Sequence, residues 1–119
     1  MLLTFAMIAA AGGALFTLAM TLAFAVDPDW AMRRAHHRLR DLPAVMTGRY
    51  AGFTALAAGS ALYGDAIVIL YLFVVFAAIS FYDAYLYASQ GEPWWPHAVA
   101  GGLCFLVIGF AGAAVIAGY

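Results

Sequence analysis

Four side chains that can carry charge or move a proton fall within otherwise apolar segments of this chain: Arg49, Asp83, Tyr87 and His97. Asp83 is the one charged residue in the run Ala66–Ala88, and a carboxylate in such a run is costly unless another group compensates it. We expect Arg49 to compensate it first and His97 second. Tyr87 follows Asp83 by four residues and therefore shares its helical face. The set predicts a polar cluster inside the membrane.

Arg49 and Asp83 are expected to lie at similar depth. Each is about five residues from the same end of its apolar segment, or roughly 7–8 Å at the rise of an α-helix. A hairpin folded at Gly64-Asp65 places Arg49 opposite residues near Ser80, less than one turn from Asp83. The planar guanidinium suits a bidentate contact with a carboxylate. Two interpretations stay open: a buried Arg49–Asp83 pair that fixes helix register, or a pocket for a small ligand or a proton.

The sequence offers little for metal or covalent chemistry. His36 and His37 are adjacent, so on a helix they point about 100° apart and cannot easily share one ion. The single cysteine, Cys104, excludes an internal disulfide and a CxxC site. We therefore predict no catalytic residue, no metal and no cofactor. An enzyme that uses His97 and Asp83 as an acid–base pair is the least favoured hypothesis, because no nucleophile motif or nucleotide loop accompanies them.

The composition indicates which elements must position these groups. The 119 residues are 67% hydrophobic and 9% charged, whereas soluble domains are nearer half apolar and a quarter charged. A chain this short cannot bury so much apolar surface within itself, and lipid must cover the remainder. The sequence predicts an all-α membrane protein, with residues 1–119 forming one transmembrane domain. We expect a four-transmembrane-helix antiparallel bundle.

The four spans are expected at about residues 2–26, 44–63, 66–88 and 98–118. Residues 2–26 have a rival interpretation as a secretory signal, because Ala23-Phe24-Ala25 resembles a cleavage site. The absence of a basic n-region and the length of the apolar run favour a retained helix.

Small residues and turn residues organise the other three spans. The second span carries a stripe that lets another helix approach closely in lipid: Gly48, Gly52, Ala55 and Gly59. The fourth span has Gly101, Phe105, Gly109 and Ala113 on one face. Gly64-Asp65 predicts a tight turn, with Asp65 solvated or capping a helix. Gly91 and two prolines predict that residues 89–96 lack regular structure.

A short basic segment separates the first two spans. Asp27 and Pro28 predict the start of a helix, with Asp27 as its cap. We expect this segment to lie in the headgroup layer, with four arginines near lipid phosphates: Arg33, Arg34, Arg38 and Arg40. A solvated basic loop is the alternative interpretation. The positive-inside rule places this segment in the cytoplasm, so a multi-pass protein of the cell inner membrane with both termini on the periplasmic side is expected.

The order of polar residues resembles that of small four-helix bacterial membrane proteins of the DoxX-like type. The matching features are Gly48-Arg49, Asp83 and Pro96-His97, which spread over residues 48–97. This resemblance implies a four-helix bundle without a settled activity. The small multidrug resistance transporters differ, because their essential acid lies in a first span that here has none.

Two functional hypotheses follow from these features. The first is a non-enzymatic accessory or interaction subunit, because packing stripes are abundant and catalytic motifs are absent. The alternative is a homodimeric carrier of a small solute or protons that uses Asp83 and Arg49. The expected partners are membrane lipids and a second copy or a larger membrane complex, with no nucleic acid.

Overall fold

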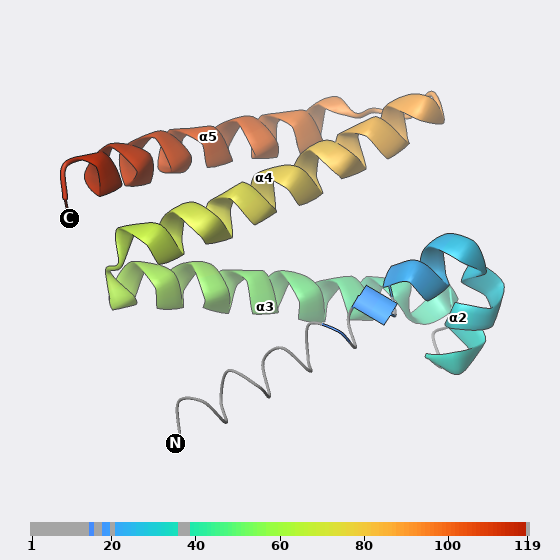
Figure 1. The fold of residues 1–119 in the computed structure, drawn as a ribbon. Helices are drawn as coiled ribbons and strands as arrows, with labels where there is room; N and C mark the ends of the chain where they lie inside the picture. The colour runs from blue at the N-terminus through green and yellow to red at the C-terminus, as the bar shows by residue number, and fades with distance from the viewer. Residues whose placement is uncertain (1–14, 16–17, 20, 36–38, 119) are drawn as a thin grey trace, which may run out of the picture. The chain divides into compact units, whose positions relative to one another are not determined.

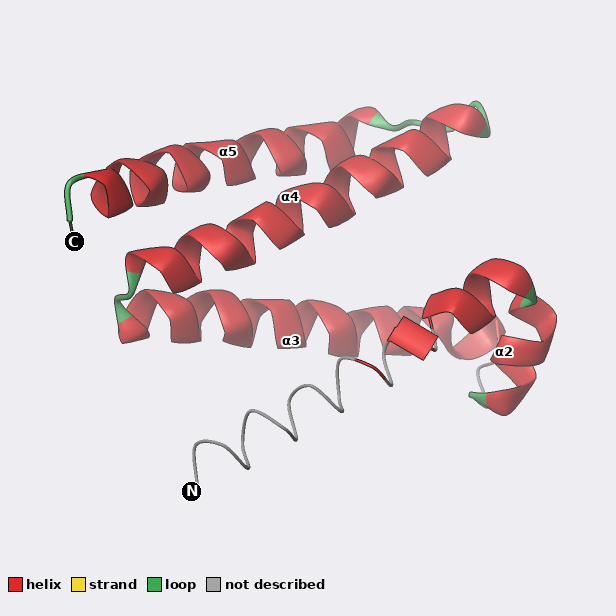
Figure 2. Ribbon diagram, viewed as in Figure 1, coloured by secondary structure: helices red, strands yellow, loops and turns green. Residues whose placement is uncertain are grey.

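The computed structural model describes residues 15, 18–19, 21–35 and 39–118, and every element within them is helical. Figures 1 and 2 show these elements, which are α2 (Pro28–Arg34), a 3₁₀ helix (Leu39–Asp41), α3 (Leu42–Tyr63), α4 (Ala66–Ser89) and α5 (Trp95–Ile116). The chain divides into two compact units, Met1–Gly48 and Arg49–Tyr119. The all-helical class predicted from the sequence is confirmed for the described part of the chain.

The first unit contains α2, whose start follows the predicted capping chemistry. The Asp27 side chain accepts a hydrogen bond from the Trp30 amide at 2.9 Å, and Pro28 opens the helix. Proline is tolerated there because the first amides of a helix have no intrahelical acceptor. Most of the predicted first span lies outside the described residues, as do His36, His37 and Arg38.

A two-residue connection joins α3 to α4 in the second unit. Gly64 has a positive φ of 75° and its amide donates to the Ser60 carbonyl at 3.0 Å, which ends α3. Asp65 then caps α4 by accepting from the amides of Ile67 and Val68 at 2.9 and 3.0 Å. Glycine at a left-handed helix end and aspartate at an N-cap are the favoured choices. The predicted tight turn and the capping role of Asp65 are confirmed.

The connection between α4 and α5 reverses the chain through a Schellman motif. Gly91 has a φ of 73°, and the amides of Gly91 and Glu92 donate to the carbonyls of Ala88 and Tyr87 at 3.1 and 2.9 Å. The prediction that residues 89–96 are irregular is wrong at both ends, because α4 extends to Ser89 and α5 already begins at Trp95. Pro96 fits the first turn of that helix, where its missing amide hydrogen breaks no bond.

Small residues bring α4 and α5 together. Among the described helices these two are the pair whose Cα atoms lie within 8 Å of each other along the helices. Ala77 and Ala84 on α4 and Gly101 and Ala111 on α5 are buried. Phe81 covers Gly101 so closely that a Cβ built there would lie 2.7 Å from its ring. The contact thus depends on the missing side chain at Gly101, which leaves room for the Phe81 ring.

Two of the described helices, α4 and α5, are long and apolar enough to cross a membrane. Their 24 and 22 residues correspond to about 36 and 33 Å, and a bilayer core is about 30 Å thick. Their most apolar windows have mean hydropathies of 2.3 and 2.4, yet 6% and 11% of these windows are buried. The core helix of a soluble protein would be mostly buried, so these helices differ from one.

Candidate functional site

The site lies where the C-terminal end of α4 meets the first turn of α5. Asp83 lies six residues before the end of α4 at Ser89. The Schellman motif then reverses the chain, and His97 lies two residues after the start of α5 at Trp95. Nδ1 of His97 lies 4.0 Å from Oδ2 of Asp83. That distance is an electrostatic contact and exceeds a hydrogen bond. From the sequence we expect His97 to be the second group that compensates Asp83, after Arg49. In the structure His97 is the group that contacts the Asp83 carboxylate.

Tyr87 completes this cluster from the same face of α4. Its ring lies 4.6 Å from the imidazole of His97 between centroids, with 30° between the planes. Asp83 and Tyr87 are four residues apart, so one turn of α4 presents both side chains to His97. The sequence predicts a cluster of Arg49, Asp83, Tyr87 and His97, and of these four the structure brings Asp83, Tyr87 and His97 together.

The cluster is open to its surroundings. The side chain of Asp83 is 38% exposed and that of His97 is 27% exposed. At the start of α5, Pro96 has no amide hydrogen and the His97 amide donates to the Trp94 carbonyl at 3.2 Å. The imidazole of His97 is therefore the group of α5 that the structure places beside the Asp83 carboxylate.

Arg49 does not join this cluster. It is exposed on α3, and within the described residues it forms no ion pair with Asp83. The register expected for the hairpin is present, because Phe53 on α3 lies against Phe76 on α4 with ring centroids 5.3 Å apart. That register puts Arg49 opposite Ser80, and Figure 1 shows α4 leaving α3 with distance from the turn. The described residues of the single chain contain no Arg49–Asp83 ion pair, and this pair stays a prediction.

The arginines predicted to contact headgroups lie in the first unit. Arg33 and Arg34 are exposed in the last turn of α2, where positive charge favours the helix end. The guanidinium of Arg34 lies 5.8 Å from the centroid of the Trp30 ring. Nε of Arg40 lies 3.4 Å from the Asp41 carboxylate. Arg38 lies outside the described residues.

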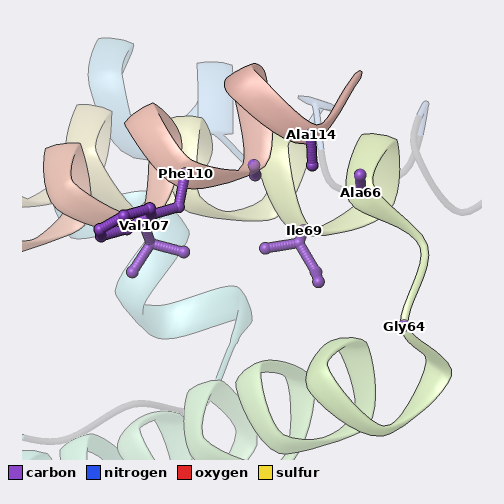
Figure 3. A pocket seen from close by; sticks show the side chains of 7 residues that line it. Gly64, Ala66, Ile69, Val107, Phe110 and Ala114 are labelled. Atoms are coloured by element: carbon purple, nitrogen blue, oxygen red, sulfur yellow. The ribbon is translucent and has the colours of Figure 1, made fainter. Parts of the chain in front are cut away.

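Two shallow grooves lie at the other end of α4, near the Gly64 turn. Figure 3 shows the first, of about 380 Å³, with side chains of α4 and α5 around it; its lining is Gly64, Ala66, Ile69, Val107, Phe110, Ala111 and Ala114. The second, of about 310 Å³, lies between α3 and α4 and is lined by Ala55, Leu56, Gly59, Ser60, Tyr63, Val68, Tyr71 and Leu72. Neither lining includes Asp83 or His97. The hydroxyl of Ser60 already donates to the Ala57 carbonyl at 2.9 Å.

The chemistry of the cluster is limited to charge and protons. It combines a carboxylate, an imidazole and a phenol, which can share a proton or attract a cation but include no serine or cysteine nucleophile. No group of three or more metal-binding side chains occurs in the part of the chain that the structure describes. The cluster is therefore a candidate for ion pairing or proton transfer.

Comparison of the chain with protein-family models, with curated proteins and with solved structures found no match.

Proposed function

We propose that this chain is an integral membrane protein that acts by associating with other membrane-embedded protein and has no enzymatic role. The observation that carries this proposal is the exposure of its two most apolar helices, of which 6% and 11% of the most apolar window is buried. The buried apolar residues in the described part are four alanines: Ala31, Ala77, Ala84 and Ala111. No large apolar side chain in the described part is fully buried, so lipid or a partner must cover much of this surface.

The proposed topology is a four-span antiparallel bundle in the cell inner membrane, with both termini on the periplasmic side. The exposed Arg33 and Arg34 on α2 support a cytoplasmic position for that segment, near lipid phosphates. The connection between α4 and α5 lies on the same side in this topology. Its exposed Trp94 and Trp95 suit a membrane–water interface.

The open face of α3 supports association with another helix. A Cβ placed on Gly48, Gly52 or Gly59 would meet no atom within 4 Å. Lipid tails cover apolar surface as well as a protein does, so helices associate in membranes where small residues permit close packing. Small residues are buried between α4 and α5, whereas the glycines of α3 named above have no neighbouring helix packed against them in the described part of the chain.

The direct test is purification of the full chain in a mild detergent or in lipid nanodiscs, followed by native mass spectrometry. We expect a stoichiometric protein partner, either another copy or a different protein. Gly52→Leu should reduce its recovery, because the leucine fills the open face of α3. Gly109→Leu on α5 is the matched control, since a Cβ there also meets no atom within 4 Å. Repeated recovery of the chain with lipid alone would refute the proposal.

A homodimeric carrier of protons or a small solute is the second candidate. The half-exposed contact of Asp83 with His97 favours it, because a carboxylate and an imidazole in an apolar segment can pass a proton. Proteoliposomes with a trapped pH dye should then show proton flux that Asp83→Asn abolishes. Flux that is absent from the native protein, or unchanged by Asp83→Asn, would rule this function out.

A further inference from the structure

We propose that Arg49 of one protomer pairs with Asp83 of a second copy of this chain, so that a symmetric dimer contains two such pairs. The inference rests on the proposed membrane location and names the partner. Arg49 and Asp83 both lie in helices of the second unit, and the structure does not pair them with each other.

Neither charge has an adequate partner among the described residues of one protomer. Arg49 is exposed and makes no ion pair in the described part of the chain. In the described part of the chain Asp83 has one ion-pairing neighbour, the imidazole of His97, at 4.0 Å, and its side chain stays 38% exposed. A charge inside a bilayer is costly until a counter-charge, water or a headgroup compensates it. A separate source of compensation is therefore required for each.

Lipid can satisfy one of these charges but not the other. A long arginine side chain can extend to a phosphate of the headgroup layer. A carboxylate repels that phosphate and needs a cation. The chain has no lysine, and four of its five arginines fall between Arg33 and Arg40. Arg49 is therefore the arginine that an apolar helix of this protein offers to Asp83.

A second copy supplies this partner in both directions. Every protomer carries one Arg49 and one Asp83, so a two-fold interface is self-complementary and satisfies both charges twice. Arg49 precedes Gly64 by 15 residues and Asp83 follows Asp65 by 18, which places them about 22 and 27 Å from the turn along their helices. A two-fold axis along the membrane normal keeps these heights. The difference of about one helical turn is within reach of an extended arginine.

The surface beside Arg49 admits the second protomer. Gly48 and Gly52 flank Arg49 on α3, and a Cβ on either would meet no atom within 4 Å. A neighbouring helix can therefore approach the α3 backbone closely there. Open backbone next to an unpaired cation is the combination that an incoming acidic helix requires.

The test uses two single variants that restore opposite charges to each other only when they meet in one dimer. Arg49→Asp and Asp83→Arg are expressed separately and together, each with its own affinity tag, and dimers are measured by native mass spectrometry in nanodiscs. We expect the wild-type chain to dimerise and each single variant to dimerise at least about tenfold more weakly, because like charges then meet across the interface. In the mixed pair, both contacts join opposite charges, and the heterodimer should recover near wild-type strength.

Several controls make the outcome decisive. Circular dichroism of each single variant establishes that it stays helical. Glu92→Arg tests whether an exposed charge elsewhere matters, and we expect this variant to dimerise normally. A wild-type dimer whose single variants are not rescued by mixing would refute the inference. A monomer that retains a different stoichiometric protein would refute it and leave the proposed function standing. Recovery with lipid alone would refute both.

Discussion

The contact between α4 and α5 differs from the contact between α3 and α4, although all three helices are rich in glycine and alanine. Where α4 meets α5, four small residues are buried: Ala77, Ala84, Gly101 and Ala111. Phe81 covers Gly101 and lies 5.8 Å from Phe105 between ring centroids. Between α3 and α4 the structure places one ring contact, Phe53 with Phe76, and a shallow groove. Small residues alone therefore do not determine which helices pack.

The difference shows what a small residue needs in order to hold a helix pair. At Gly101 a large neighbour fills the space that the missing side chain leaves, so dispersion contacts replace it. At Gly52 and Gly59 a Cβ would meet no atom within 4 Å, so no neighbouring side chain packs against the backbone there. Within the second unit, the α4–α5 pair is the tightly packed part, and α3 presents an accessible face.

Gly101→Leu should cause the largest loss and would break the α4–α5 side of this comparison. A Cβ at Gly101 already lies 2.7 Å from the Phe81 ring, so a leucine must displace this ring from the contact between the two helices. Overpacking of this kind costs about 1–3 kcal/mol or more. Thermal or SDS-induced unfolding in detergent measures it. Gly102→Leu is the control, since that neighbouring position is open, and equal losses for both variants would contradict the packing described for Gly101.

Asp65→Ala should have an intermediate effect, at the joint between α3 and α4. The carboxylate accepts hydrogen bonds from two amides of α4, and loss of an N-cap typically costs about 1 kcal/mol. Asp65→Asn retains an oxygen acceptor and should lose much less. Unfolding of both variants under the same conditions provides the measurement. Equal stability of the alanine and asparagine variants would show that the cap contributes nothing.

Gly59→Ala should have the smallest effect on the stability of the single chain, and it sharpens the contrast with Gly101. The added methyl meets no atom within 4 Å, and alanine favours helix over glycine by up to about 1 kcal/mol. We expect unfolding resistance to stay equal or to rise slightly. A clear loss would show that α3 packs tightly at this position, and a loss of dimer alone would place Gly59 in the interface between protomers.

The helices and their ends were largely predictable because local chemistry determines them. Asp27, Gly64 and Asp65 act on amides and carbonyls within a few residues, so their positions in the sequence identified the caps and the tight turn. The sequence predicts a loop at Trp95 and Pro96, where the structure starts α5, because a proline in the first turn of a helix and a proline in a loop look the same in a sequence.

The lateral arrangement of the helices was less predictable. Steps of four residues from Gly101 to Ala113 drift by about 40° each, so Ala113 ends far from the buried face, which instead follows Gly101 to Ala111. The same limit affects Arg49. Its register relative to α4 follows from the turn. The separation of the two helices depends on how side chains such as Phe53 and Phe76 pack, which the spacing of residues in the sequence does not predict.

The placement of His97 after the α4–α5 connection has a consequence for synthesis. Asp83 precedes His97 by 14 residues, so at about 5–20 residues per second the ribosome adds the imidazole roughly 1–3 s after the carboxylate. In the proposed membrane setting, Asp83 therefore leaves the ribosome before the imidazole that contacts it. The contact between Asp83 and His97 forms when α5 follows α4.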